Sequence, residues 1–155
     1  MRPYRVKKKE GGYIHVQPHF DLGALAHSLS QYRKAVLHYR KEIKQSNSSK
    51  AHYNLGVIFQ ERRRYLRAIS EYTQAIKGHR AFHQAYCNMG VCYRRLRRYE
   101  QAIKMFQKAV QLDQDNEMYQ INLALAYADD GAFDEAGSLL REFFAKSKQR
   151  KQKRK

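Results

Sequence analysis

Arginine is concentrated in two short segments of the sequence. Together they contain Arg62, Arg63, Arg64, Arg67, Arg94, Arg95, Arg97 and Arg98. The guanidinium group is planar and permanently charged, so it favours two-point contacts with phosphate or carboxylate groups. Two interpretations stay open for these segments: a surface that binds RNA or another polyanion with a strong dependence on salt, and a solvated charged face.

No group of residues in the sequence predicts catalysis. His79 and His83 are four positions apart, but they straddle a turn expected after Gly78, and no carboxylate or thiolate completes a metal-binding set. The sequence has no glycine-rich phosphate loop and no signature of a nucleophile with its base. We therefore expect a protein that is not an enzyme and that holds no cofactor and no metal ion.

Charge is distributed unevenly along the 155 residues. The chain has 31 Lys and Arg against 14 Asp and Glu, a net charge of +17. Residues 113–135 include seven acidic residues and no basic one, whereas seven of the ten residues from 146 to 155 are basic. This basic tail has nothing to bury, so alone it is expected to be disordered. It fits a nuclear-import signal, a nucleic-acid arm or a membrane-surface contact.

The sequence predicts neither a transmembrane segment nor a secretory signal. Its longest stretch without a formal charge, residues 81–93, is shorter than the roughly 20 apolar residues of a membrane-spanning helix. Gly11 and Gly12 interrupt the region where a secretory signal has its apolar run. Cys87 and Cys92 are interpreted as reduced packing residues. We expect an intracellular protein, with the cytoplasm as the first interpretation and the nucleus or an organelle left open.

A repeat of 34 residues must position all of these groups. The two middle copies match at Leu55, Gly56, Phe59, Tyr65, Ala68, Tyr72 and Ala75, and at Met89, Gly90, Tyr93, Tyr99, Ala102, Phe106 and Ala109. Apolar residues recur at helical spacing on both sides of a polar break, which predicts a helical hairpin in each copy. One hairpin cannot bury both of its faces, so we expect an all-α solenoid of about four stacked hairpins.

The copies define the expected domain organisation. A basic extension at residues 1–15 precedes a repeat domain at 16–145 and the basic tail at 146–155, and the units are at about 16–48, 49–82, 83–116 and 117–145. Small residues at Gly56, Gly90 and Ala124 predict close approach of the two helices, with Tyr65, Tyr99 and Phe133 packed beside the turns. The polar breaks place the arginine segments, together with Arg33 and Lys34, at turns along one edge of the solenoid.

The repeat resembles the tetratricopeptide repeat family over about residues 16–149, with small departures such as His52, Tyr86 and Gln120 in place of the family's tryptophan. The resemblance implies an interaction module with a concave groove, lined mainly by the first helix of each unit, for a peptide or partner helix. The groove positions are Asn54, Asn88, Asn122, Tyr53, Val57, Cys87 and Val91.

The resemblance also indicates how such a groove could work. The three asparagines recur just before each Leu-Gly-like pair, and an asparagine ladder of this kind holds the main chain of a peptide in some members, because an amide is both donor and acceptor. The alternative is that these amides are merely solvated. The family's carboxylate clamp for chaperone tails matches only at Asn88, so that role is not expected.

The groove positions of the last unit are apolar: Met118, Ile121 and Leu125. They could receive an apolar ligand segment or pack against the protein's own C-terminal helix. We favour the second interpretation because Phe143 and Phe144 must be buried somewhere.

The sequence as a whole predicts a non-catalytic scaffold or assembly factor that binds a protein or peptide partner in the concave groove. The alternative is a structural protein associated with RNA or a ribonucleoprotein, which would bind phosphates through the arginines and the basic ends. The oligomeric state and the identity of the partner are not predicted.

Overall fold

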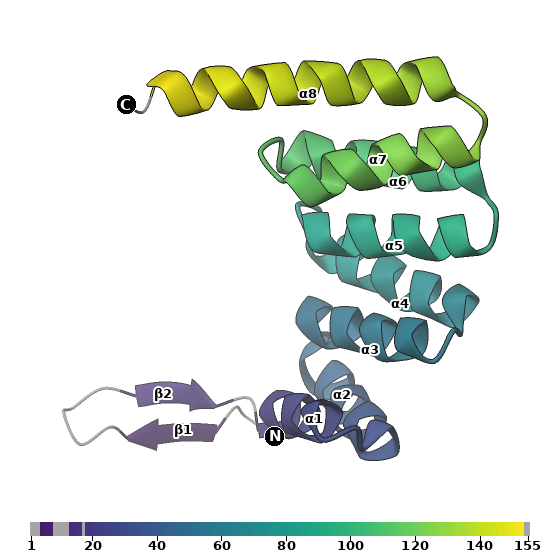
Figure 1. The fold of residues 1–155 in the computed structure, drawn as a ribbon. Coiled ribbons are helices and arrows are strands. Elements are labelled where there is room, and N and C mark those ends of the chain that lie inside the picture. Colours follow the sequence, from purple (N-terminus) through teal and green to yellow (C-terminus); the bar gives the residue numbers. More distant parts are fainter. Residues whose placement is uncertain (1–3, 8–12, 17, 154–155) are drawn as a thin grey trace. The chain divides into compact units, whose positions relative to one another are not determined.

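The computed structural model describes residues 4–7, 13–16 and 18–153 of the chain. In Figure 1 the helices of this part follow each other in antiparallel pairs. They are α1 (Pro18–Ser28), α2 (Tyr32–Ser46), α3 (Ser49–Glu61), α4 (Tyr65–Gly78), α5 (His83–Arg95), α6 (Tyr99–Leu112), α7 (Glu117–Asp129) and α8 (Phe133–Lys153). The predicted fold class, helical hairpins of the α-solenoid type, is confirmed.

The chain forms two compact units, which we call unit 1 (residues 1–80) and unit 2 (residues 81–155). In unit 1, α2 packs on α3, and in unit 2, α6 packs on α7, so two hairpins share a core within each unit. Side chains buried in unit 1 include Ala35, Tyr39, Ala51, Leu55, Ile58, Ala68, Tyr72 and Ala75. Those buried in unit 2 include Ala85, Cys92, Ala102, Phe106, Ala109, Leu123 and Ala126.

A short β-hairpin precedes the helices. Strand β1 (Tyr4–Lys7) pairs antiparallel with β2 (Tyr13–Val16), with Tyr4 opposite Val16 and Lys7 opposite Tyr13. This region was expected only to be a basic extension, and the two strands were not predicted. The available signal was the alternation of apolar and polar residues from Tyr4 to Lys7 and from Ile14 to Val16, which favours strands. Residues 1–3 and 8–12 of the extension lie outside the described residues.

Close contact between a glycine and an aromatic ring joins the two helices of each of the first three hairpins. The pairs are Gly23 with Tyr39, Gly56 with Tyr72 and Gly90 with Phe106. A β-carbon built on Gly90 would lie 2.8 Å from Phe106 Cε1, closer than such atoms pack in proteins. The ring therefore occupies the space that any other residue would fill with its side chain, which confirms the predicted close approach of the helices.

The fourth hairpin departs from this pattern. Ala124 takes the place of the glycine, and Leu140 takes the place of the ring. Phe133 was predicted to pack beside the turn, but this is wrong: its side chain is 70% exposed. Tyr99, at the corresponding position of α6, is partly buried because α7 packs on α6, whereas no described helix follows α8.

The turn inside each hairpin contains one residue with a positive φ angle, two positions before the second helix. These residues are Ser30, Arg63, Arg97 and Gly131, with φ angles of 57°, 55°, 59° and 87°. Glycine adopts this left-handed conformation without strain, whereas for other residues it costs about 1 kcal/mol or more of folding free energy. Two hairpins therefore carry a strained arginine where the last hairpin has glycine.

The basic tail continues α8. The helix extends to Lys153, so the predicted disorder is wrong for residues 146–153. Lys, Arg and Gln are good helix formers, and extending an existing helix avoids the unfavourable nucleation step that an isolated segment would face. The last two residues of the tail, 154 and 155, lie outside the described residues.

The glycine–aromatic contact predicts opposite effects for two Gly→Ala substitutions. Alanine favours a helix over glycine by about 1 kcal/mol, but overpacking a core costs about 1–3 kcal/mol. Gly90→Ala should therefore lower the free energy of unfolding by about 1–2 kcal/mol. Gly137→Ala should raise it by up to about 1 kcal/mol, because a β-carbon there meets only the flexible end of Arg141, at 3.4 Å.

Urea denaturation followed by circular dichroism measures both changes. Gly90→Ala with Phe106→Leu, which imitates the Ala124 and Leu140 pair, should recover part of the loss. Equal stability of Gly90→Ala and the wild-type protein would contradict a tight contact between α5 and α6.

Candidate functional site

The structure places the three candidate asparagines on first helices, one in unit 1 and two in unit 2, and all three are partly buried. Asn54 Nδ2 donates a hydrogen bond to Tyr39 Oη at 3.0 Å. Asn122 Nδ2 donates to Cys87 Sγ at 3.6 Å. Asn88 also makes contacts within the protein. A bound peptide could use only the remaining N–H and the carbonyl oxygen of Asn54 and Asn122.

Asn54 and Tyr39 line a hollow of about 490 Å³ between α1 and α3 in unit 1, which we call the α1–α3 hollow. Its wall includes His27 and Glu61, whose Nε2 and Oε2 atoms lie 2.9 Å apart and connect the two helices. Burial raises the pKa of the Tyr39 phenol, although the Asn54 hydrogen bond opposes part of this shift. Tyr39 therefore stays protonated near neutral pH, and it is only 1% exposed.

Tyr53 and Val57 were also predicted to line the groove. Both are partly buried on α3, and the Tyr53 ring packs against the Tyr72 ring with 5.7 Å between their centroids. Neither residue lines the α1–α3 hollow. In unit 1, therefore, the polar residue Asn54 borders an open space and its two predicted neighbours serve mainly in packing.

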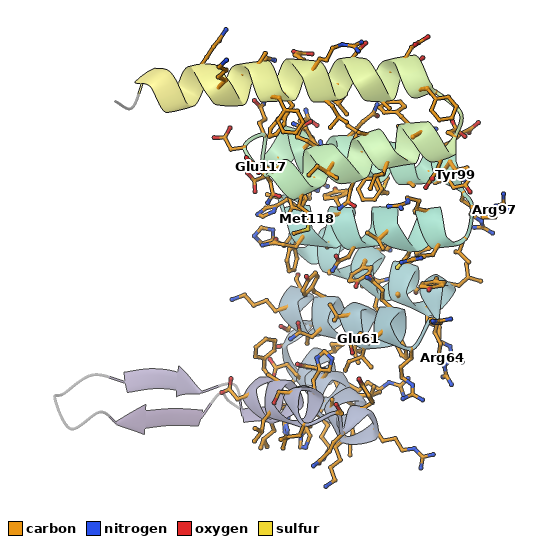
Figure 2. All side chains as sticks on the ribbon, in the orientation of Figure 1. Glu61, Arg64, Arg97, Tyr99, Glu117 and Met118 are labelled. Atoms are coloured by element: carbon orange, nitrogen blue, oxygen red, sulfur yellow. The ribbon has the colours of Figure 1, made fainter. Side chains whose placement is uncertain are left out.

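Unit 2 has an apolar stripe on α7 that the chain leaves uncovered. Met118 is 65% exposed, and Ile121 and Leu125 are each 43% exposed. Their spacing puts them on one face of the helix, and Figure 2 shows Met118 beside Glu117 at the N-terminal end of α7. The favoured interpretation, in which α8 covers this stripe, is wrong.

The reason is that α8 packs on α7 from another side. Phe143 is 8% exposed and belongs to the core, whereas Phe144 remains 56% exposed. The rings of Phe143 and Phe144 contact each other, with their centroids 5.6 Å apart. Phe143, together with Ala136 and Leu139, attaches α8 to the core, and the α7 stripe stays open.

The two cysteines are core residues with free thiols. Cys87 is 4% exposed and Cys92 is fully buried, so Cys87 does not line an open groove as predicted. Burial raises the pKa of the Cys87 thiol to about 11, although the Asn122 hydrogen bond lowers it in part. Burial also raises the pKa of Cys92 to about 12. Val91, one turn after Cys87, is partly buried.

Unit 1 contains a second hollow, of about 370 Å³, which we call the arginine hollow. It is lined by Arg33, Arg40, Arg62, Arg64, Arg67, Tyr32, Val36, Ile58 and Phe59. Figure 2 shows Arg64 beside the turn that joins α3 to α4. Arg33 was predicted to lie with the turn arginines, whereas Arg40 was not predicted as a site residue. The signal was their seven-residue spacing, which puts both on one face of α2.

The arginines of unit 2 are in a different electrostatic environment. Arg94 Nε donates to Asp129 Oδ2 at 2.7 Å. Arg97 Nε donates to Tyr99 Oη at 3.3 Å, and Figure 2 shows both residues at the turn between α5 and α6. Arg95 and Arg98 are exposed. The acidic residues near the end of α7 therefore neutralise part of the positive charge in this unit.

The histidines near the unit boundary make structural contacts. His83 Nδ1 lies 2.8 Å from Tyr119 Oη and 3.9 Å from Asp113 Oδ2. Among the described residues, no three His, Cys, Asp or Glu side chains come close enough together to hold a metal ion. None of the described helices has the length and apolar character needed to cross a membrane.

Buried thiols predict slow chemical labelling. At pH 8 a thiol with a pKa of about 11 is almost entirely protonated, and only the thiolate reacts with a disulfide reagent. Both cysteines should react with Ellman's reagent at least ~100 times more slowly in the folded protein than in urea. Absorbance at pH 8 measures the two rates. Fast reaction of one thiol, traced to Cys87 with Cys92→Ala as control, would show that Cys87 lines an accessible groove after all.

Comparisons with known proteins agree with the geometry. One profile of the tetratricopeptide repeat matches residues 49–77, and another matches residues 83–116. The sequence matches no curated protein. A crystal structure of MamA superposes with a TM-score of 0.79 at 21% identity, covering 86% of this chain and 79% of that chain.

Two further solved structures share the fold. MamA from Desulfovibrio magneticus RS-1 has a TM-score of 0.77 at 22% identity, covering 86% of this chain and 76% of that chain. The TPR domain of Arabidopsis OM64 has a TM-score of 0.66 at 24% identity, covering 70% and 90%. Because the profile matches coincide with the two hairpins that carry the glycine–aromatic contacts of Gly56 and Gly90, the chain belongs to the tetratricopeptide repeat family, a family of protein-interaction scaffolds.

Proposed function

We propose that this protein is a non-catalytic scaffold that binds a polypeptide segment along the first helices of its hairpins. The observation that carries the proposal is the exposed stripe of Met118, Ile121 and Leu125 on α7. Single exposed apolar residues are common on protein surfaces, whereas a contiguous apolar patch on a first helix is typical of an interaction site.

The chemistry of the stripe indicates the kind of segment that it would take. Three side chains at helical spacing match an apolar segment or the apolar face of a partner helix. Burying them would contribute roughly 25 cal/mol for each Å² removed from water. Glu117 precedes Met118 at one end of the stripe, which favours a segment with a basic residue at its flank.

The α1–α3 hollow offers contacts of another kind. Asn54 lines this hollow and retains one N–H and its carbonyl oxygen. Groups of this type bind the N–H and C=O of an extended main chain without selecting side chains. This supports binding of a peptide main chain by unit 1, in addition to binding of apolar side chains by unit 2.

A second candidate function, binding of RNA or another polyanion, is favoured by the exposed basic residues of unit 2. Arg95 and Arg98 are exposed at a turn, and Lys146 and Lys148 are exposed on α8. Their charge attracts phosphates regardless of sequence, so this binding would depend strongly on salt.

Loss of the α7 stripe should weaken peptide binding. Peptides selected from a random displayed library on the full chain should bind the double variant Ile121→Glu with Leu125→Glu at least ~10-fold more weakly, because two charges replace apolar contacts. The matched control is Leu66→Glu, a leucine 60% exposed on the second helix of its hairpin. Fluorescence anisotropy measures the affinities. Equal effects of the two variants, or none, would exclude the stripe as the site.

The RNA alternative makes a separate prediction. Binding of a labelled mixed-sequence RNA should weaken steeply with salt, with a log–log slope near −0.7 for each phosphate contacted. Removal of residues 146–155 should make the slope less steep by up to ~5, since seven basic residues are lost. A slope near zero in the full chain would reject this alternative, and an unchanged slope after truncation would assign the contact to the arginines.

A further inference from the structure

The arginine hollow of unit 1 combines concave shape with concentrated positive charge. Five arginine residues line its 370 Å³, from α2, from the turn after α3 and from α4. The apolar residues Ile58 and Phe59, which are 0% and 7% exposed, form part of the lining. All five arginines are themselves exposed, so a ligand can reach them from solvent.

Nothing within the described part of the chain neutralises this charge. None of the five arginines makes an ion pair there. Residues 18–80 contain 12 Lys and Arg but only four Asp and Glu. Three of these four have partners elsewhere: Glu42 with Ser46, Glu61 with His27 and Glu71 with His52. Like charges gathered in this way repel each other, and a bound anion would reduce this repulsion, so the hollow is suited to an anionic ligand.

We propose that the arginine hollow binds a phosphorylated serine or threonine side chain of the partner polypeptide, a proposal that rests on the proposed scaffold function. A phosphomonoester carries a charge of about −1.5 to −2 at pH 7 and offers three strong acceptor oxygens. Guanidinium forks form paired, charge-assisted hydrogen bonds with such a group. A carboxylate has a single charge and two oxygens, so it could contact fewer of the five arginines.

The lining of the hollow favours a phosphopeptide over RNA. Binding of single-stranded RNA relies on aromatic rings on which bases stack. Of the two aromatic residues here, Phe59 is buried. The other, Tyr32, has the Arg62 guanidinium 5.3 Å from its ring centroid and the His27 ring 5.9 Å from it. A base would have to displace these neighbours, whereas a phosphate group requires no free ring.

The hollow also lies next to the proposed peptide-binding surface of the same unit. Tyr32 lines both the arginine hollow and the α1–α3 hollow. A segment whose main chain contacts Asn54 can therefore place a side chain among the arginines without leaving unit 1. In this arrangement phosphorylation of the partner would control its binding to the scaffold.

The test uses two degenerate peptide pools that differ only in a fixed central phosphoserine or serine, with a mixed-sequence RNA as the third probe. The hollow variant is Arg64→Gln with Arg67→Gln, since both residues are exposed and Arg64 makes no side-chain capping bond. The control is Arg95→Gln with Arg98→Gln, two exposed arginines outside the hollow. Both variants lose the same charge, and circular dichroism checks that both fold.

Fluorescence anisotropy should show that the phosphoserine pool binds the wild-type chain at least ~10-fold more tightly than the serine pool. The hollow variant should lose this preference and the control should keep it. The proposal would be overturned if both variants lost the preference for phosphoserine equally. It would also be overturned if the hollow variant weakened RNA binding more than it weakened phosphoserine binding. If the serine pool binds through the α7 stripe and phosphoserine adds nothing, the phosphate site is wrong and the scaffold function stands. If neither pool binds, both are wrong.

Discussion

The contact between a glycine on the first helix and an aromatic ring on the second is the constraint on which the hairpins depend. Tyr72 and Phe106 are fully buried against glycines that leave no room for a β-carbon. This contact sets how closely the helices approach and which face of the first helix turns away from its partner. The residues beside each glycine, Asn54 and Asn88 among them, are thereby fixed at the edge of the core, where they are partly buried.

The fourth hairpin shows the consequence of relaxing this constraint. With Ala124 and Leu140 in place of glycine and ring, no large side chain of α8 is buried at that position. Phe143, Ala136 and Leu139 attach α8 to the core, while Phe133 and Phe144 stay exposed. The exposed stripe of α7 lies in this same hairpin. The proposed apolar binding surface and the departure from the repeat pattern therefore coincide.

The fold could be predicted from the sequence because the information is local and repeated. A glycine and its ring are 16 residues apart in each of the first three hairpins, so one spacing describes all three. The environment of each surface group could not be predicted in this way. Arg94 is neutralised by Asp129, 35 positions away, and Cys87 is covered by Asn122, also 35 positions away. Such pairings depend on neighbouring hairpins and on side-chain conformations that no single repeat encodes.

The same repeat consequently yields two electrostatically different surfaces. In unit 1 two of the four carboxylates among residues 18–80 contact histidines, His27 and His52. The turn arginines of this unit make no ion pair within the described residues. In unit 2 a carboxylate at the end of α7 contacts a turn arginine directly. Arginine is always charged near neutral pH, whereas histidine as a residue type is often neutral. Because these two carboxylates contact histidines, they do not neutralise the arginines of unit 1. A bound anion would provide neutralisation that unit 1 lacks, whereas in unit 2 Asp129 already neutralises Arg94, and an apolar stripe on α7 is exposed for a partner.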